Sequence, residues 1–550
     1  MPMYVINNRI VFLLFISSAY LTYNTLYVNE LASGIGIYGG VFKVNILTQV
    51  FDIVLLLTGS IVTLLTCYVP HSPGRPTGRP GDNNEKGESK EYSLLLLFTT
   101  VGACLLISAQ NLISIYLALE LQSFTLYLIA ASKIESFKGT SGGLKYFLLG
   151  GLSSGFILFG FTILYAYTGS LNLDSIFMIY STNNYSGNYY IEISLLIIFA
   201  GLFFKVSAAP FHNWAPDVYS DVPTISTTWL IVIAKLSVLV LILILVHNLH
   251  SGLNLNTLTF NSVHDLYNFH SEYNEEPLGF WTNFITLSAC LSLIFGTIVG
   301  LNQGLTKRLL AYSTISHVGF LLAALSINSV ASIDAFIFYL IQYTITNINL
   351  FFIIITWGFI YTSYYLSSNN TITSSFPSAA RETKNNIMSN SNKISTSDYS
   401  DYYSEYTEWN FTPVPAISQL KGMHFTDPYL AFCLAISIFS LAGIPPLIGF
   451  FAKQQVLLAS MQLDYYFLSF LIINTSVIGA AYYLRIVKFI YFFNEVFFAI
   501  DNNNDKKKSF TYVDLSLFIA LFTSIILFYI IKPYVFLDLV HIISISLDFF

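Results

Sequence analysis

Charged residues are scarce in this sequence. Asp, Glu, Lys and Arg make up only 10% of its 550 residues, whereas hydrophobic residues make up 55%. A soluble domain carries about 25% charged residues, so this composition excludes an ordinary soluble protein. The long apolar runs, separated by short polar stretches, instead predict an all-α polytopic membrane protein.

Cysteine is rarer still, and the four cysteines stand singly in apolar runs. Without a CxxC pair they argue against a zinc site, an iron–sulfur cluster or a disulfide framework. No GxGxxG or Walker loop lies between a strand and a helix, so no nucleotide site is predicted. We expect no nucleic-acid partner for this chain, whose net charge is −6.

The apolar runs predict about thirteen membrane-spanning helices. Two of them, 333–363 and 428–461, exceed the ~20 residues that cross a bilayer, so bends or breaks are expected there. The final stretch, VFLDLVHIISISLDFF, predicts an amphipathic helix at the interface. The predicted spans are 9–27, 44–69, 93–109, 111–132, 142–168, 191–213, 223–248, 280–300, 307–325, 333–363, 428–461, 463–495 and 512–533.

Basic residues alternate from loop to loop. They concentrate in the loops after even-numbered spans, whereas the loop 249–279 has no Lys or Arg and carries acidic residues. Under the positive-inside rule, the basic loops face the matrix or cytoplasm. This orientation predicts a matrix N-terminus and a C-terminus on the other side. The loop 365–427, rich in Ser, Asn, Thr and Tyr, is expected to be a flexible insertion.

Four charged residues lie deep in predicted spans and belong to no loop: Glu120, Lys205, Lys235 and Lys453. His317 lies about ten residues into its own span. At ~1.5 Å per residue, each is roughly 15 Å from the end of its helix, near the bilayer centre. A charge at that depth costs at least ~2.5–3.5 kcal/mol on insertion scales, so charges there usually serve a function. A single lysine can also snorkel or pair structurally, and a buried His317 can simply be a packed neutral imidazole.

This arrangement suits proton transfer. Low dielectric disfavours a charged lysine and a nearby carboxylate favours it, so Glu120 and Lys205 predict a proton-loading pair. From there, Lys235 and His317 are expected to pass the proton laterally toward Lys453. Interleaved hydroxyls that can order water are Ser207, Thr227, Thr228, Ser237, Ser313, Thr314 and Ser316.

Prolines interrupt two of these spans. Pro210 follows Lys205, and Pro445 and Pro446 precede Lys453. Broken helices at membrane depth are tolerated where they are buried in protein or line a water-filled cavity. Paired breaks in corresponding halves are typical of inverted-repeat transporters. The chain is therefore expected to contain N-terminal helices (1–92), two inverted five-helix repeats (93–248 and 280–495) and a C-terminal part (512–550).

Five ordered motifs carry a resemblance to a known family. The stretches LALELQSFTLYLIAA, GGLKYFLLGGLSSG, FKVSAAPFHNWAPDVY, TKRLLAYSTISHVG and LAGIPPLIGFFAK resemble subunit 2 of the antiporter-like subunits of NADH:ubiquinone oxidoreductase, respiratory complex I. The length and the Asn- and Tyr-rich loops resemble a fungal mitochondrial version. Long family members have about one helix more than the spans predicted above, so either a first helix is absent or one span is overlooked.

The resemblance implies that Glu120 and Lys205 form the Glu–Lys pair, Lys235 is the connecting lysine and Lys453 the terminal one. It implies a multi-pass protein of the mitochondrial inner membrane that translocates protons beside other membrane-arm subunits, including neighbouring antiporter-like subunits, and lipids such as cardiolipin. FMN, iron–sulfur clusters, NADH and ubiquinone would be bound elsewhere in that complex, with no cofactor or metal in this chain. Alternatives are a subunit of a multi-subunit sodium/proton antiporter complex and a structural subunit that moves no protons.

Overall fold

The computed structural model describes residues 3–32, 34–67, 91–132, 136–182, 189–255, 280–374, 414, 416–493 and 513–548. Helix dominates these ranges, as the apolar composition predicts. Every predicted span coincides with a helix. The helices of the first half are α1 (Met3–Thr25), η1 (Asn29–Ala32), α2 (Ile46–Cys67), α3 (Tyr92–Ser108), α4 (Leu112–Ala130), α5 (Phe137–Thr168), α6 (Leu173–Thr182), α7 (Tyr189–Val206), α8 (Trp214–Asp221), α9 (Thr224–Trp229), η2 (Leu230–Ala234) and α10 (Lys235–Leu255).

The second half repeats this pattern of long apolar helices. Within the described ranges of the whole chain, nine helices are long and apolar enough to cross a membrane on their own. The polytopic prediction is therefore confirmed. The remaining helices are α12 (Phe280–Leu301), α13 (Thr306–Ile327), α14 (Val330–Ser374), η4 (Ile417–Leu420), α17 (Met423–Thr426), α18 (Pro428–Ala442), α19 (Ile448–Gln462), α20 (Tyr466–Phe492), α21 (Val513–Phe528), η6 (Tyr529–Ile531) and α22 (Pro533–Asp548).

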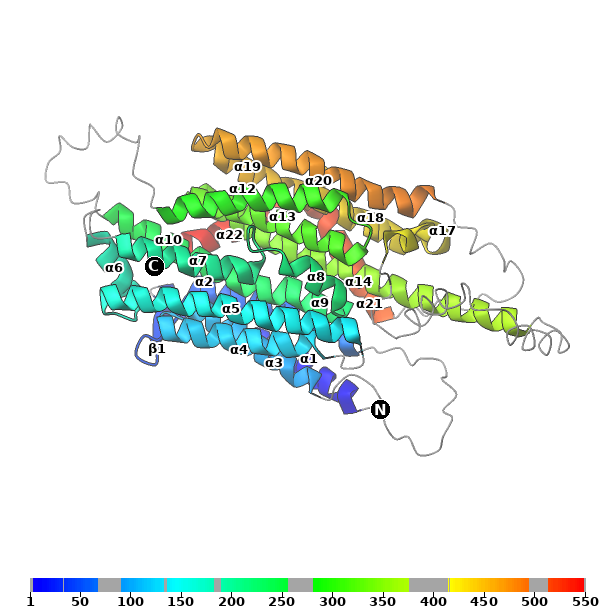
Figure 1. The fold of residues 1–550 in the computed structure, drawn as a ribbon, viewed down its shortest axis with the longest axis horizontal. Helices are drawn as coiled ribbons and strands as arrows, with labels where there is room; N and C mark the ends of the chain where they lie inside the picture. The colour runs from blue at the N-terminus through cyan, green and yellow to red at the C-terminus, as the bar shows by residue number, and fades with distance from the viewer. Residues whose placement is uncertain are drawn as a thin grey trace, which may run out of the picture.

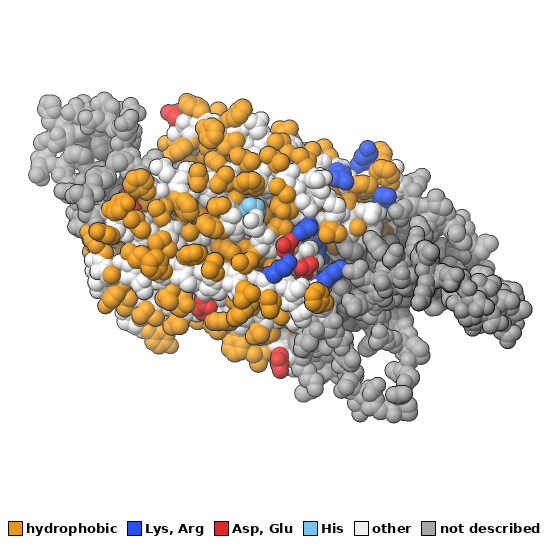
Figure 2. All heavy atoms as spheres, viewed as in Figure 1, with side chains coloured by type: hydrophobic (Ala, Val, Ile, Leu, Met, Phe, Trp, Pro, Cys, Tyr) orange, Lys and Arg blue, Asp and Glu red, His pale blue; other side chains and the backbone are white. Residues whose placement is uncertain are grey.

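The helices lie side by side along the long axis of the molecule, with the N- and C-termini toward opposite ends (Figure 1). Helices α10, α13 and α14 form the centre of this bundle and are buried over most of their length. The outer surface is largely apolar, and on the face drawn in Figure 2 the Lys and Arg side chains gather toward one end, whereas the few Asp and Glu side chains are scattered. Such a surface suits a hydrocarbon environment, where apolar side chains cost nothing to expose.

Two helices are broken in the middle of the bundle. α7 is followed by α8, and α18 by α19, and the two broken helices run in opposite directions along the long axis (Figure 1). Their surroundings match as well, since α5 packs on both arms of the first broken helix, α7 and α8, as α14 packs on both arms of the second, α18 and α19.

Close glycine contacts repeat in the same two halves. A Cβ at Gly102 of α3 would lie 2.9 Å from the backbone nitrogen of Gln122 in α4. A Cβ at Gly296 of α12 would lie 2.6 Å from the backbone nitrogen of Ser316 in α13. The same number of residues separates the glycine from its contact in both pairs. The absence of a side chain lets each pair of helices approach closely.

Three features differ from the sequence expectation. α14 runs unbroken through 333–363, because no proline interrupts it. A two-stranded antiparallel hairpin joins β1 (Ile35–Ile37) to β2 (Phe42–Val44), a minor addition to an otherwise helical fold. A π-helical turn, η2, directly precedes Lys235; such turns are frequent at functional sites.

The C-terminal part folds back on the bundle. α21 and α22 are bent by 94° relative to each other, and α22 packs against α2 and α14. His541 of α22 lies 3.0 Å from the Asp334 carboxylate of α14. The predicted amphipathic helix is thus present as α22. The acidic loop within 256–279 and most of the predicted insertion (375–413) lie outside the described residues.

Candidate proton-transfer site

The first helix break lies next to Lys205. α7 ends at Val206, and Ser207 follows with a positive φ of 64°. The carbonyl of Phe203 accepts a hydrogen bond from the Ala208 amide at 2.9 Å. The carbonyl of Phe204 accepts from the indole Nε1 of Trp214, also at 2.9 Å. The chain therefore satisfies carbonyls that the interrupted helix leaves open, and α8 holds the break in place.

Lys205 contacts a tyrosine. Its Nζ donates to the Tyr127 hydroxyl at 3.3 Å and lies 5.7 Å from the centre of that ring. Glu120, two turns before Tyr127 on α4, accepts from the Ser123 hydroxyl at 3.4 Å. Glu120 is near enough to Lys205 for an electrostatic interaction. Among the described residues, however, the two form no direct ion pair, so the predicted pair is close but not in contact.

Lys235 connects the first break to the second half of the chain. Only 1% of Lys235 is exposed, and its Nζ donates to Ser207 Oγ at 2.9 Å and to Thr314 Oγ1 at 3.1 Å. Ser207 belongs to the break after α7, whereas Thr314 belongs to α13. A neighbouring bond, from Gln122 to Ser237 at 2.9 Å, ties α4 to α10. Lys235 therefore hydrogen-bonds to residues that are far apart in the sequence, and its role as the connecting lysine stays a prediction.

His317 is held between three helices. Its Nδ1 lies 2.6 Å from the Tyr339 hydroxyl of α14, and its Nε2 lies 3.1 Å from the Tyr483 hydroxyl of α20. Tyr483 also donates to Ser313 Oγ at 2.8 Å. Both ring nitrogens thus face a hydroxyl group. A histidine in this position can take a proton at one nitrogen and release it at the other.

Lys453 lies at the second break. Its Nζ donates to the carbonyls of Leu441 and Ala442, each at 2.9 Å. These are the last carbonyls of α18, where the helix dipole favours a cation. Gly443 follows with a φ of 84°, and a Cβ there would lie 2.9 Å from Lys453 Cδ. Glycine is needed at this position both for its backbone conformation and for the space that Lys453 occupies.

Comparison with known proteins agrees with this geometry. A family described as "NADH:quinone oxidoreductase/Mrp antiporter, TM" matches residues 109–263, 253–376 and 408–479. NADH-ubiquinone oxidoreductase chain 2 of Rhizopus oryzae is 40% identical to this chain, over 98% of this chain and 95% of the relative. The chain belongs to this antiporter family. Subunit N of the NADH-quinone oxidoreductase of Parvibaculum lavamentivorans, another relative, is 30% identical over 83% of this chain and 76% of its own length.

Solved structures show the same antiporter fold. Respiratory complex I from Thermus thermophilus matches with a TM-score of 0.64 at 21% identity, covering 96% of this chain and 93% of that chain. The Mrp complex from a Dietzia species matches with a TM-score of 0.68 at 14% identity, covering 98% and 92%. At these identities the likeness concerns the fold. The predicted resemblance to chain 2 of complex I rests on the sequence relatives, which confirm it.

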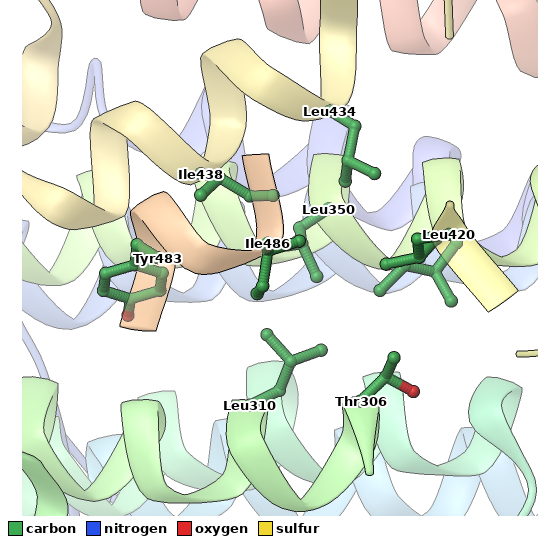
Figure 3. A pocket seen from close by; sticks show the side chains of 9 residues that line it. Thr306, Leu310, Leu350, Leu420, Leu434, Ile438, Tyr483 and Ile486 are labelled. Carbon is green, nitrogen blue, oxygen red and sulfur yellow. The ribbon is translucent and has the colours of Figure 1, made fainter. Parts of the chain in front are cut away.

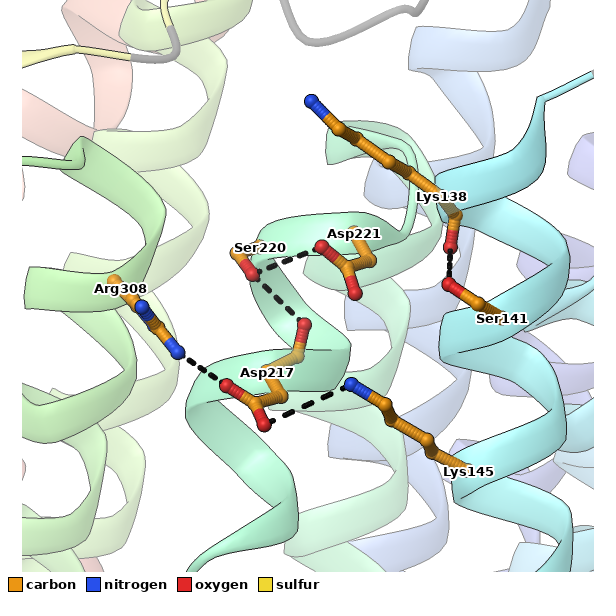
Figure 4. A network of polar contacts seen from close by, with 7 residues as sticks. All are labelled: Lys138, Ser141, Lys145, Asp217, Ser220, Asp221 and Arg308. Atoms are coloured by element: carbon orange, nitrogen blue, oxygen red, sulfur yellow. Dashed lines mark hydrogen bonds and ion pairs between the residues drawn. The ribbon is translucent and has the colours of Figure 1, made fainter.

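One cluster of this antiporter chain was not predicted from the sequence. Asp217 of α8 pairs with Arg308 of α13, and its other oxygen lies 3.8 Å from Lys145 Nζ of α5 (Figure 4). Close by, Lys307 Nζ donates to the Val222 carbonyl just after α8 at 2.6 Å. We call Asp217, Lys145 and Arg308 the α8 ion cluster. It fastens the second arm of the first broken helix to both neighbouring helices.

Other functional candidates were also missed. Tyr127, Tyr339 and Tyr483 contact the predicted path, but tyrosines are too common in this sequence to single these out. Asp52 of α2 is 9% exposed, lies beside Cys104, and its Oδ1 has no hydrogen-bond partner among the described residues. A scan of predicted spans for acidic residues would have found it. Of the predicted hydroxyls, Thr227 and Thr228 bond only to carbonyls one turn earlier in the bonds that the structure gives them.

A cavity lies beside Tyr483, where side chains of α13, α14, α18 and α20 face one another (Figure 3). Its lining is apolar apart from the hydroxyls of Tyr483 and Thr306, so it offers no charged group to a cofactor. The described ranges contain no group of three or more His, Cys, Asp or Glu side chains that could hold a metal ion. The lining residues are Thr306, Leu310, Leu350, Ile354, Leu420, Leu434, Ile438, Tyr483 and Ile486.

Proposed function

We propose that this chain translocates protons as a membrane-arm subunit of respiratory complex I, driven by NADH:ubiquinone electron transfer elsewhere in the complex. The observation that carries the proposal is Lys235. A fully buried lysine that donates to Ser207 at the first break and to Thr314 of α13 joins the two halves of the chain through exchangeable groups. Burying a charge at membrane depth is costly, and charged residues found there usually mark the pathway of a transported ion or proton.

Each predicted residue takes one step in this proposal. Glu120 favours the charged form of Lys205 when the two approach, and Lys205 loads a proton. The proton passes to Lys235, whose acceptor Thr314 lies one helical turn before His317 on α13. His317 relays it between its two nitrogens toward Lys453. Lys453 then releases it toward the exit or the neighbouring subunit.

The rival function is a subunit of a multi-subunit sodium/proton antiporter complex. The fold likeness to the Mrp complex supports this alternative, since one family contains subunits of both NADH:quinone oxidoreductases and Mrp antiporters. The relatives named as NADH oxidoreductase chains support the complex I assignment instead. Purification of the native complex separates the two, because only complex I brings flavin and iron–sulfur subunits with it.

The repeat organisation is part of the same proposal. Two inverted units, 93–248 and 280–495, account for the opposite courses of α7–α8 and α18–α19. The matching glycine contacts of α3 with α4 and of α12 with α13 support the same division. Residues 1–92 and 512–550 then flank the repeats. Their helices α2 and α22 pack together, which closes the bundle on one side.

We infer the surroundings from the same family relation. The mitochondrial inner membrane is the expected location, since the fungal relative is a ubiquinone oxidoreductase chain. Neighbouring antiporter-like subunits, other membrane-arm subunits and lipids such as cardiolipin are the expected partners. The chain itself contributes no redox centre in this proposal; FMN, iron–sulfur clusters, NADH and ubiquinone act in other subunits.

Glu120→Gln tests the function. The amide keeps the shape of the side chain but removes the charge that favours protonated Lys205, so proton pumping should fall at least about tenfold in an assembled complex. Pumping is measured by quenching of a pH-sensitive dye in inner-membrane vesicles. Glu192→Gln is the matched control, because it makes the same exchange in the first turn of α7, whereas Lys205 lies in the last turn of that helix. Normal pumping by an assembled Glu120→Gln complex would refute the proposal.

A further inference from the structure

The polar line is interrupted between His317 and Lys453. The hydrogen bonds that the structure gives His317 go to Tyr339 and Tyr483, and those of Lys453 go to two backbone carbonyls of α18. Within the described part of the chain, no hydrogen bond joins one group to the other. A proton that leaves His317 for Lys453 must therefore cross a step without a permanent polar contact.

Phe320 occupies this step. It lies one turn after His317 on α13 and is only 2% exposed. Its ring centre is 6.4 Å from that of His317, and it stacks on the Tyr339 ring at 5.7 Å with an interplanar angle of 21°. The Lys453 Nζ lies 5.3 Å from the centre of the Phe320 ring. One phenyl ring thus contacts the histidine, its tyrosine partner and the terminal lysine.

A phenyl ring has two effects in this position. It carries no exchangeable proton and excludes water, so it closes the route as a hydrophobic constriction does in a channel. The negative face of the ring also attracts a cation, more strongly when the cation is desolvated. Phe320 therefore opposes passage of the proton but stabilises Lys453 once Lys453 carries it.

We propose that Phe320 is the gate between His317 and Lys453, an inference that rests on the proposed proton translocation. When the ring turns aside, water bridges the two groups. An N–H bond of the His317 imidazolium breaks, an N–H bond forms on the neutral Lys453 amine, and the bridging waters are regenerated, so one positive charge moves from His317 to Lys453. The ring then returns over the ammonium group and prevents back-transfer.

Two substitutions separate the two effects of the ring. Phe320→Tyr adds a hydroxyl that bridges the dry step, so protons slip back: NADH oxidation without uncoupler should rise about twofold or more while protons pumped per electron pair fall. Phe320→Met keeps an apolar side chain of similar volume but removes the aromatic face. It should keep the protons pumped per electron pair while the coupled rate falls about 3- to 30-fold, the range that a desolvated cation–π contact corresponds to.

Phe199→Tyr and Phe199→Met are the matched controls. Phe199 of α7 is fully buried and stacks on Phe203 and Trp281, away from the predicted path. These variants report what an added hydroxyl or a lost ring does to assembly alone, which native gels measure for all four variants. Both controls should pump with wild-type stoichiometry.

The outcomes distinguish the gate from the function. Wild-type stoichiometry and respiratory control in an assembled Phe320→Tyr complex would overturn the gate. If that variant does not assemble, Phe320→Met decides, and a wild-type coupled rate overturns the proposal. Normal pumping by Glu120→Gln would instead remove the proposed function itself. Loss of pumping in Glu120→Gln together with a fully coupled Phe320→Tyr complex would refute the gate alone.

Discussion

At the scale of single residues, the three lysines of the predicted path all donate to neutral acceptors. Lys205 donates to a tyrosine, Lys235 to two hydroxyls and Lys453 to two carbonyls. Neutral acceptors satisfy the ammonium hydrogens without a carboxylate in direct contact. Losing the proton then does not leave a buried unpaired anion, whose cost would be several kcal/mol. This chemistry suits a group that must gain and lose a proton repeatedly.

Lys205 allows a direct test of this idea. Lys205→Met deletes the proton carrier and keeps much of the bulk, so it should abolish pumping in an assembled complex. Lys205→Arg should also fail, because guanidinium keeps its proton at a pKa above ~12. If Lys205 were only a structural cation, Lys205→Arg would keep pumping, whereas Lys205→Met would still lose it. Proton translocation by both assembled variants decides, and a fully active Arg variant would contradict the proton-carrier role.

Gly443 is the second residue that merits substitution. Gly443→Ala places a Cβ against Lys453 Cδ and forces alanine into the left-handed region, at a cost of roughly 1–2 kcal/mol. We expect Lys453 to lose its carbonyl acceptors and pumping to fall. Gly169→Ala is the control: φ is also positive, 67°, but a Cβ there meets nothing within 4 Å. Assembly should suffer similarly in both; equal pumping would show that Lys453 does not need this space.

At the scale of elements, the two breaks share a local design but use it differently. Ser207 and Gly443 both have positive φ, and a proline follows each three residues later, Pro210 and Pro446. Aligned in this way, the lysines do not coincide: Lys205 precedes its break, whereas Lys453 follows its own. The two stretches AGLFFK, which ends at Lys205, and AGIPPLIGFFAK, which ends at Lys453, are similar in sequence but do not occupy corresponding places in the two broken helices. Each lysine reaches its break from the opposite arm.

The α8 ion cluster gives a prediction for one of these arms. Asp217→Asn removes the pairs with Arg308 and Lys145. The side chains of these pairs are 40% to 51% exposed, so the pairs contribute little to global stability, ~1 kcal/mol or less. Local opening of α8 should still become easier, and amide hydrogen exchange within 214–221 should accelerate up to about fivefold. Exchange in α19 serves as the internal reference and should not change. Unaltered exchange in α8 would show that the cluster does not hold this helix.

At the scale of the whole molecule, Lys235 and His317 place the path at the junction of the two halves. Lys235 reaches α13 from α10, and His317 is held by α14 and α20. The most buried helices thus carry the polar groups, while the outer helices present apolar side chains. This is the reverse of a soluble protein, and it follows from an apolar environment around the bundle.

The orientation of the bundle is testable without substitution. We predict that the basic loops face the matrix, so that the N-terminus lies in the matrix and the acidic loop 249–279 lies on the opposite side. Protease added to inside-out vesicles should therefore leave that loop intact and remove an N-terminal tag. Right-side-out mitoplasts serve as the control: there the protease should cleave the loop and leave the N-terminal tag intact. Cleavage of the loop from the matrix side would overturn the assignment.

The sequence alone determined the class of protein, the positions of the helices, the two breaks and the buried ionisable residues. These are readable because a bilayer demands long apolar helices, and each charge or proline inside them carries a large cost. The resemblance to chain 2 of complex I added expected roles for Glu120, Lys205, Lys235 and Lys453. Nothing in the local pattern fixed what those side chains touch.

The tertiary structure decided those contacts. Lys205 meets Tyr127 instead of pairing directly with Glu120, His317 meets Tyr483 from a helix far along the chain, and the Phe320 ring lies beside both His317 and Lys453. Such contacts depend on how helices rotate and pack against one another. Packing in a membrane leaves only a weak periodic signal, since outward and inward faces are both largely apolar. The sequence shows which residues are charged, but only the folded bundle shows which of them lie close together.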